Sequence, residues 1–421
     1  MNYNLFKTAF VILGEYLAYC FHHNMQKTII NIADKLSEIN VVYVKFLQAI
    51  SADSHIIDLE LKNKLNKYTD DVSYTDDDID YSFLKLIQES GLFLRNNKPI
   101  NSGLIALVFK AYDKNGKAYA VKVKRLHIYK KVIENVREIE QIVNYLMGYE
   151  YFRKINIKKK FIDNKFILFQ QLDFENEVEN MKLFENNFKN IDYVVIPHVY
   201  EEYTQKNNNV IVMDFIDGDK LDDILEEDKS IYCKLMAKFG LKTLFFDGIY
   251  HSDLHKGNIL FIRDTPHTEN ATTVNEGSPP DLSYKLGIID FGIIGKVTRE
   301  HQNIFYEFIK MTYEKDFYNA ASYMFDNIFE PQEKKDDISL NNKNILIQNI
   351  ANIFERTICE TKCASSKEIY EINNYLGEYE LEISNFFSEI QIALLVNDRL
   401  CNALSIEGAF LDIYGEELLK L

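Results

Sequence analysis

Apolar residues recur at helical spacing through the first part of the chain. From Phe6 to Asn66 they lie three and four positions apart, as in Ile29, Ile32, Leu36 and Ile39. This spacing places them on one face of an α-helix, a face that must be buried against other elements. The pattern predicts successive helices over this region.

A β-hairpin is predicted further along the chain. The runs Leu104 to Tyr112 and Lys117 to Val123 are rich in apolar and β-branched residues, and Asp113 to Gly116 separates them. Because the separating segment ends in Asn-Gly, which is typical of a tight hairpin turn, the two runs are expected to pair. The acidic segment Thr69 to Asp80 is expected to be a solvated linker whose aspartates cap a helix at Phe83 to Ile87.

Helical spacing returns after the hairpin. It covers Tyr129 to Phe152 and Asp163 to Phe184. The apolar run Val210 to Phe215 predicts a strand, and from Leu221 onward the pattern is mostly helical.

Two short apolar runs, Ile259 to Ile262 and Leu286 to Ile289, interrupt this last helical region and predict strands. The segment Asp264 to Tyr284 between them holds three prolines and reads as a loop. The order of elements predicts an α+β protein in three parts. These are a helical extension over 1–98, a β-rich lobe over 99–217, and a helix-rich lobe over 218–421 with a loop insertion over 264–284.

The composition excludes several classes of protein. With 47% hydrophobic and 27% charged residues, the 421 residues can bury a sizeable core. A net charge of -16 repels phosphate backbones, so we expect no nucleic-acid partner. No sufficiently long apolar run predicts a membrane span, since Lys7 and Glu15 interrupt the apolar stretch Leu5 to Phe21, which also has no cleavage site of small residues. We therefore expect a protein that is not secreted and is cytoplasmic or peripheral to an intracellular membrane.

Two segments carry candidate chemistry for phosphoryl transfer. The first, His251 to Asn258, reads His-Ser-Asp-Leu-His-Lys-Gly-Asn, and the second is Asp290-Phe291-Gly292 after a short strand. Phosphoryl transfer needs a carboxylate that orients the acceptor and oxygen ligands for the metal that bridges the phosphates. Asp253 is the candidate catalytic carboxylate, and Asn258 and Asp290 are the candidate ligands of Mg²⁺. An Asp-aromatic-Gly turn is weak by itself, but the two patterns together are specific.

A lysine inside the predicted hairpin is the candidate phosphate ligand. A lone strand lysine is usually at an edge or faces solvent, yet Lys122, in Ala-Val-Lys-Val, stands where a kinase-type lysine reaches the α and β phosphates of ATP. Such a lysine needs a carboxylate partner, for which we select Glu177. Glu138 and Glu140 are competitors, and a solvated helix face explains them better.

The phosphate-covering loop departs from the usual glycine-rich pattern. A GxGxxG motif is expected between Ile100 and Val108, but the chain has Asn-Ser-Gly-Leu-Ile-Ala with a single glycine. Backbone amides can still cradle phosphates there. The candidate residues for binding ATP are Asn101, Ser102, Gly103, Ala120, Lys122, Met213 and Phe215.

These motifs resemble those of the UbiB family of atypical kinases, also called AarF-domain or ADCK kinases, over nearly the whole chain. The family motif HxDxHxGN matches His251 to Asn258, and its metal-binding turn matches Asp290 to Gly292. Its KxGQ motif falls on Lys45 to Gln48 and its ExD motif on Gln171 to Asp173. The glutamate of its lysine pair falls on Glu177.

The resemblance implies a protein-kinase-like bilobal fold whose N-terminal extension carries the KxGQ-like motif. It implies ATP and Mg²⁺ as cofactors, a role around isoprenoid-lipid or quinone metabolism, and a lipid or a lipid-pathway enzyme as partner. The basic stretches Lys122 to Lys131 and Arg153 to Lys160 are consistent with contact to anionic lipid, although a solvated surface explains them better.

The resemblance also implies regulatory residues. In the family, the KxGQ helix folds over the active site and its lysine lies close to the ExD acid, which points to Lys45, Gln48, Gln171 and Asp173 here. Gln171 stands where the family has glutamate, and Leu47 stands where it has glycine. We expect the inhibitory clamp to be weakened, because Lys45 loses a charge partner.

Two other functions compete with an ATP-dependent kinase or ATPase of this type. A small-molecule phosphotransferase of the aminoglycoside or choline kinase type shares a His-x-Asp-x-x-x-x-Asn loop, but Lys45 to Gln48 and Gln171 to Asn180 disfavour it. A pseudokinase would bind nucleotide and regulate a partner without turnover. After Gly292 the chain passes directly into a helix near Arg299 with no APE-like segment, which argues against a conventional protein kinase.

Overall fold

The computed structural model describes residues 3–39, 42–43, 72–148, 157–264, 283–361 and 366–404. The chain divides into two compact units. The first comprises Met1–Lys182 and His198–Phe215, and the second comprises Leu183–Pro197 and Ile216–Leu421. Each unit has its own strands and helices and is described by itself.

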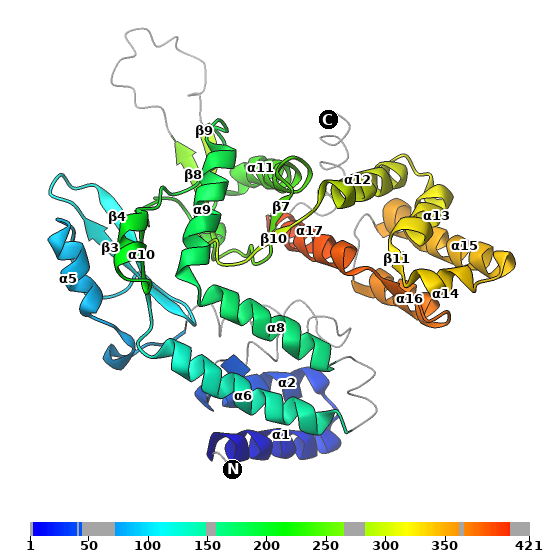
Figure 1. Cartoon of the computed structure of the whole chain (residues 1–421), viewed down its shortest axis with the longest axis horizontal. Coiled ribbons are helices and arrows are strands. Elements are labelled where there is room, and N and C mark those ends of the chain that lie inside the picture. Colours follow the sequence, from blue (N-terminus) through cyan, green and yellow to red (C-terminus); the bar gives the residue numbers. More distant parts are fainter. Residues whose placement is uncertain are drawn as a thin grey trace, which may run out of the picture. The chain divides into compact units, whose positions relative to one another are not determined.

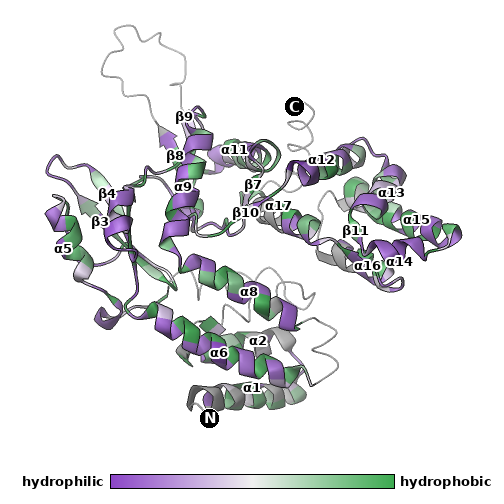
Figure 2. Ribbon diagram, in the orientation of Figure 1, coloured by the Kyte–Doolittle hydropathy of each residue, from purple (hydrophilic) through white to green (hydrophobic). Residues whose placement is uncertain are grey.

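Four helices form one layer of the first unit (Figure 1). They are α1 (Tyr3–His22), α2 (Met25–Ile39), α6 (Ile128–Leu146) and α8 (Ile157–Gln171). Buried side chains of α2, α6 and α8 share one hydrophobic core, to which Val42 and Tyr43 also belong. Along α6, hydrophobic and hydrophilic residues alternate in short bands, as expected of a helix with one buried face (Figure 2). The predicted N-terminal helices are confirmed within 3–39, whereas 44–71 lie outside the described residues.

An antiparallel sheet forms the second layer of this unit. Its strands are β1 (Phe93–Leu94), β2 (Asn101–Ser102), β3 (Ala106–Tyr112), β4 (Ala118–Lys124) and β6 (Val210–Asp214). The order is β1-β3-β4-β6, and β2 pairs with β3 near one end of that strand. The predicted hairpin is confirmed as β3 and β4. Gly116 in its turn has φ +88°, a left-handed conformation that glycine adopts at little cost.

The two faces of the sheet differ. Val121 and Val123 of β4 belong to a core shared with Phe83 and Ile87 of α5 (Ser82–Glu89). Because side chains alternate along a strand, Lys122 lies on the opposite face of β4. Short elements complete the unit, namely η1 (Asp76–Asp78) and α10 (Glu201–Lys206).

The helix predicted over Asp163 to Phe184 is two helices. α8 ends at Gln171, and α9 (Phe174–Phe188) begins three residues later. The carboxylate of Asp173 accepts the backbone N–H groups of Glu175 and Asn176, at 3.1 and 3.2 Å. An aspartate in this position satisfies the otherwise unpaired donors of a new first turn, so the prediction of one continuous helix was wrong.

The second unit contains two small sheets that carry the segments 251–258 and 290–292. In the first, the order is β5-β9-β8, built from β5 (Val194–Val195), β8 (Ile259–Asp264) and β9 (Ser283–Ile288). In the second, β7 (Ile249–His251) pairs antiparallel with β10 (Ile294–Lys296). The predicted loop over 264–284 was too long at both ends, because Asp264 pairs with Ser283 inside the β8–β9 ladder. Residues 265–282 lie outside the described residues.

Helices make up most of the second unit. They are α11 (Lys229–Leu241), the π-helix η4 (Lys242–Asp247), α12 (Arg299–Tyr313), α13 (Phe317–Asn327), α14 (Gln332–Asp336), α15 (Leu340–Arg356), η5 (Thr357–Thr361), α16 (Ser366–Gly377) and α17 (Asn385–Ala403). The short elements are η2 (Leu221–Asp223), η3 (Glu226–Asp228), β11 (Phe329–Glu330) and β12 (Glu382–Ile383). The predicted direct passage from Gly292 into a helix near Arg299 is confirmed, since only β10 intervenes before α12. None of the described helices is both long and apolar enough to cross a lipid bilayer.

A glycine in β10 gives the first testable prediction. A Cβ atom on Gly295 would lie 1.9 Å from the ring of Tyr250, its partner in β7. The ring is buried and its hydroxyl donates to Glu389 of α17 at 3.0 Å, so it has little freedom to move. We expect Gly295→Ala to lower the free energy of unfolding by about 1–3 kcal/mol, the usual effect of overpacking a core. Denaturant unfolding monitored by circular dichroism measures this loss.

The matched control is a glycine with open space around it. A Cβ on Gly14 of α1 would meet nothing within 4 Å. Gly14→Ala is therefore expected to raise the free energy of unfolding by about 0.5–1 kcal/mol, because alanine restricts the unfolded chain and favours a helix. If both substitutions changed stability in the same direction, packing against Tyr250 would not be what requires glycine at 295.

Candidate functional site

Lys122 and Glu177 form an ion pair in the first unit. The Nζ atom of Lys122 lies 2.6 Å from Oε1 of Glu177, with side chains 14% and 2% exposed. β4, which carries Lys122, lies between β3 and β6, so this lysine is not on an edge strand. The contact that we expected from the sequence is present, and α9 supplies the glutamate.

The competing glutamates of α6 have other partners. Glu138 is buried, and its carboxylate accepts a short hydrogen bond from the hydroxyl of Tyr43. Burial and the nearby carboxylate of Glu138 raise the pKa of Tyr43 far above its usual value. The interpretation of Glu138 as part of a solvated face was wrong. Glu140 does lie at the surface, where it pairs with Lys165 at 3.6 Å.

The first turn of α9 concentrates charge near the same face of β4. The Nζ atom of Lys124 lies 4.6 Å from the ring centroid of Phe174, and Lys122 lies 5.6 Å from it. Burial lowers the pKa of Lys124, while the charges of Asp173, Glu175 and Glu177 act in the opposite direction.

The residues expected to regulate the site are only partly described. Asp173 is the cap of α9 described above, and Gln171 is the last residue of α8. Lys45 and Gln48 lie outside the described residues, so the inhibitory clamp stays a prediction.

The predicted phosphate loop is a turn between β2 and β3. Asn101 and Ser102 pair with Val108 and Leu107, and the N–H of Gly103 donates to the carbonyl of Ala106 at 2.9 Å. The buried hydroxyl of Ser102 donates to the carbonyl of Val72. Ser102 therefore has no hydroxyl proton to offer a phosphate in this conformation, and its expected contribution is limited to the backbone.

The tip of this turn has amide groups available. Within the described part of the chain, the N–H groups of Leu104 and Ile105 donate no hydrogen bond. Consecutive free amides of this kind are groups that bind phosphate oxygens. Sequence reasoning missed both residues, because apolar side chains carry no signal about their backbone. A Cβ on Gly103 would meet only the carbonyl of Ala106, at 3.5 Å, so the turn does not require glycine there.

The residues expected to contact the base lie on neighbouring strands. Ala120 of β4 pairs with Met213 of β6, and both are buried. The N–H of Phe215, just after β6, donates to the carbonyl of Ala118 at 3.3 Å. The Nζ atom of Lys110 lies 3.6 Å from the centroid of the Phe215 ring.

In the second unit, His251 joins the two candidate segments for phosphoryl transfer. Its Nε2 atom lies 2.6 Å from the carbonyl oxygen of Asp290, and its Nδ1 atom accepts the N–H of Asp253 at 3.2 Å. This pair of contacts fits the neutral ring with its proton on Nε2. Burial lowers the pKa of His251, which favours the same neutral form.

Asn258 is held in one orientation. Its side-chain Nδ2 atom donates to the backbone carbonyl of Asp253 at 2.8 Å, and the backbone carbonyl of Asn258 accepts the N–H of Ile289 at 3.1 Å. Because Ile259 of β8 pairs with Ile288 of β9, the residue before β8 and the residues after β9 meet at the same end of this hairpin. Asn258 and Asp290 are therefore brought together by strand register.

The Asp-Phe-Gly turn is anchored by its aromatic ring. Phe291 is fully buried, with its ring centroid 5.1 Å from that of Phe184. The carboxylate of Asp290 accepts the N–H of Gly292 at 3.0 Å, which limits how this side chain can rotate.

The donor set of this loop suits a magnesium ion. Mg²⁺ in nucleotide sites is held by one or two carboxylates together with phosphate and water oxygens. Asp290 and Asn258 supply such oxygens, because the amide nitrogen of Asn258 is already committed to Asp253. In the part of the chain that the structure describes, no cluster of three His, Cys, Asp or Glu residues could hold a metal ion.

Residues 92–324 match the sequence profile of the ABC1 atypical kinase-like domain. Among curated relatives, the chain is similar to the probable protein kinase UbiB of Providencia stuartii, with 26% identity over 397 residues that cover 90% of this chain and 66% of that protein. It is also similar to the probable protein kinase UbiB of Shewanella sp. (strain MR-4), with 27% identity over 299 residues that cover 68% of this chain and 51% of that protein. The chain thus spans about half to two thirds of the length of these relatives.

A solved structure shows a related fold. The complex of Rv3197 with erythromycin from Mycobacterium tuberculosis superposes with a TM-score of 0.53 and 14% identity. The match covers 81% of this chain and 83% of that one. Together with the profile match, the mixture of helices and strands confirms the predicted α+β, protein-kinase-like fold.

Proposed function

Because the chain belongs to the family defined by the ABC1 atypical kinase-like domain, we propose that it binds Mg-ATP and catalyses phosphoryl transfer or ATP hydrolysis. The observation that carries this proposal is the hydrogen-bonded loop of the second unit. In it, His251 binds the backbone of both Asp253 and Asp290, and Asn258 binds the carbonyl of Asp253. A purely structural turn would not need a buried histidine that ties the backbone of two aspartates together and an asparagine side chain bonded to one of them.

Each candidate residue has a role that its chemistry allows. Asn258 and Asp290 would hold Mg²⁺, which when bound neutralises charge on the phosphates. Asp253 would orient the hydroxyl or water that accepts the phosphoryl group, or take up its proton. Lys122 would bind phosphate oxygens, and Glu177 would keep its ammonium group in place. The free amides of Leu104 and Ile105 would add backbone donors for the phosphates.

We also propose a metabolic setting for this activity. The resemblance to the UbiB family implies a role around isoprenoid-lipid or quinone metabolism, with a lipid or a lipid-pathway enzyme as partner. A cytoplasmic location, or one peripheral to an intracellular membrane, fits this setting.

Binding of Mg-ATP is the direct test. At about 100 times its dissociation constant, a ligand that binds only the folded protein adds roughly 2.7 kcal/mol of stability. We therefore expect a clear rise in Tm on addition of ATP with MgCl₂ and a smaller rise with ATP and EDTA, because Asn258 and Asp290 would act through the metal. Differential scanning fluorimetry measures both.

The same samples separate the competing functions. Release of phosphate or labelling of an added acceptor would support the enzyme. A thermal shift without turnover, also in the presence of phenolic compounds or lipid vesicles, would identify a nucleotide-binding regulator. The absence of any shift with ATP, ADP or GTP would overturn the nucleotide-binding proposal itself.

A further inference from the structure

A buried arginine lies directly behind the phosphate loop. Arg125 follows the last residue of β4, and its side chain is 6% exposed. The sequence placed it in a basic stretch that we expected to be a solvated surface, and at this position that expectation was wrong. Burial of a guanidinium group is tolerated only when its donors are satisfied.

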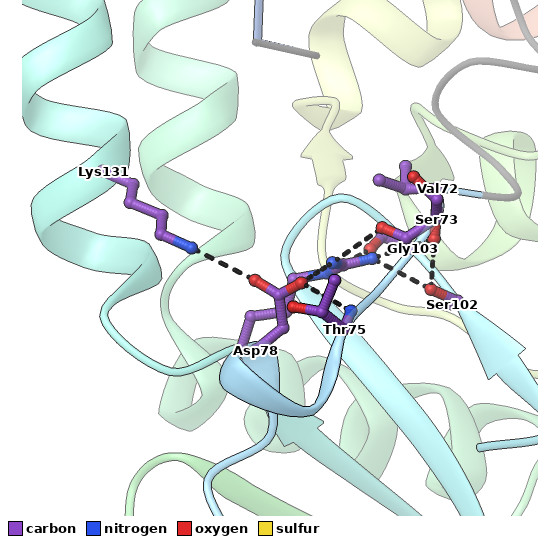
Figure 3. A network of polar contacts seen from close by, with 8 residues as sticks. Val72, Ser73, Thr75, Asp78, Ser102, Gly103 and Lys131 are labelled. Atoms are coloured by element: carbon purple, nitrogen blue, oxygen red, sulfur yellow. Dashed lines mark hydrogen bonds and ion pairs between the residues drawn. The ribbon is translucent and has the colours of Figure 1, made fainter. Parts of the chain in front are cut away.

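Five contacts satisfy the guanidinium group (Figure 3). Two reach the phosphate loop: Nε donates to the carbonyl of Gly103 at 3.0 Å, and Nη2 donates to the hydroxyl of Ser102 at 2.9 Å. The other three reach the segment Val72 to Asp78. They are Nη2 to the carbonyl of Val72 at 3.0 Å, Nη1 to the carbonyl of Ser73 at 3.2 Å, and Nη1 to Oδ2 of Asp78 at 3.2 Å.

Direct bonds between the loop and this segment surround the arginine. The N–H of Val72 donates to the carbonyl of Ser102 at 2.8 Å, and the hydroxyl of Ser102 donates back to the carbonyl of Val72. On the other side, the N–H of Arg125 donates to the carbonyl of Ile105 at 2.9 Å. The acidic segment is therefore more than the solvated linker expected from its sequence, because Asp78 and the backbone before it hold one side of the turn.

The consequence concerns the two free amides. Leu104 and Ile105 lie between Gly103 and Ala106. The side chain of Arg125 binds the carbonyl of Gly103, and its backbone N–H binds the carbonyl of Ile105. Because a peptide unit is planar, fixing the carbonyl of Gly103 also fixes the direction of the Leu104 amide, and fixing the carbonyl of Ile105 fixes the peptide unit that carries the Ala106 amide. The peptide unit that carries the Ile105 amide lies between these two fixed units. A lysine has a single ammonium group and cannot reproduce the planar fork of donors.

We propose that Arg125 is a positioning residue for nucleotide phosphates. It holds the 101–106 turn in the conformation that presents the amides of Leu104 and Ile105, and it makes this conformation depend on the segment Val72 to Asp78. The inference rests on the proposed function, because it takes the turn to be a phosphate-binding loop.

The test compares ATP with adenosine in the full chain. Isothermal titration calorimetry with MgCl₂ measures both affinities for the unaltered protein, Arg125→Lys and Lys131→Gln. We expect Arg125→Lys to weaken ATP binding by about tenfold, because misplaced donors lose most of their effect, and to leave adenosine binding within about twofold. Lys131→Gln is the matched control, since Lys131 is half exposed and contacts Asp78 at 3.1 Å but not the loop. It should change neither affinity.

A second readout needs no nucleotide. Hydrogen–deuterium exchange should show Val72 and Gly103 exchanging at least about tenfold faster in Arg125→Lys, because both amides are bonded within this network. The two positions should change together. If Arg125→Lys fails to fold, Ser102→Ala takes its place. For Ser102→Ala we expect a selective loss of ATP affinity of about threefold, smaller than that of Arg125→Lys.

The outcomes are distinct. A purely structural role would lower the Tm of Arg125→Lys and leave the ratio of ATP affinity to adenosine affinity at the unaltered protein's value, and that result overturns the inference alone. If Ser102→Ala has to be used instead, an unchanged ratio of ATP affinity to adenosine affinity in that variant also overturns the inference alone. If the unaltered protein binds neither ligand, the proposed function fails, and this inference fails with it.

Discussion

Replacing Glu177 by Gln is expected to lower the free energy of unfolding by about 3 kcal/mol, the lower end of the range for breaking a buried ion pair. The substitution keeps the size of the side chain and removes its charge. Lys122 then keeps a positive charge at a position that is only 14% exposed. Water can replace only part of the lost attraction to the ammonium group, because the side chain of residue 177 is only 2% exposed. Urea unfolding of the two proteins at neutral pH measures the difference.

The first unit offers a matched control for this substitution. Lys182 and Glu201 form an ion pair with the same separation, 2.6 Å, but their side chains are 52% and 46% exposed. Exposed pairs contribute about 0–1 kcal/mol, so Glu201→Gln should cost far less than Glu177→Gln. Equal losses at the two positions would show that burial of the Lys122 pair is not what makes it important for stability.

Asp290→Asn is expected to lower ATP turnover by about two to three orders of magnitude. A metal ligand in phosphoryl transfer contributes several kcal/mol of charge stabilisation, and each 1.36 kcal/mol corresponds to a factor of ten in rate. The fold should survive. An asparagine oxygen can still accept the N–H of Gly292, and His251 contacts the backbone of residue 290 rather than its side chain. Steady-state phosphate release and the Tm of each protein are the measurements.

Asp113 provides the matched aspartate. It too lies in a turn and accepts backbone N–H groups, from Asn115 at 2.8 Å and Lys117 at 2.9 Å. It has no expected role with a metal, so Asp113→Asn should keep turnover near the unaltered rate. Full turnover in Asp290→Asn would show that the metal ligand had been assigned to the wrong residue.

Local sequence patterns predicted correctly the elements that hold most of the candidate site residues. The Asn-Gly turn placed Lys122 on the middle of a strand, and the spacing of Asp253 and Asn258 placed them at the ends of one loop. These predictions are correct because turn chemistry and strand periodicity act over a few residues. Glu177 was selected as the partner of Lys122 because such a lysine needs a carboxylate, and the family resemblance points to the same residue. The contact in the structure agrees with this choice.

Features that depend on contacts between distant residues could not be predicted from the sequence. The helical spacing of apolar residues continues through Leu172 and Asp173, so the break between α8 and α9 could not be read from periodicity. Glu138 has the same charge and spacing as a surface residue, yet it is buried and bonded to Tyr43, 95 positions away in the sequence.

By itself, then, the sequence determined most of the elements, the hairpin and the candidate site residues, because each depends on neighbours a few positions apart. Only the tertiary structure decided what surrounds them. It turned Ser102 away from a phosphate role, brought Asp78 to Arg125, and freed the amides of Leu104 and Ile105. The physical reason is that a buried charge or polar group takes whichever partner the packing brings within about 3 Å, and sequence distance places no limit on that choice.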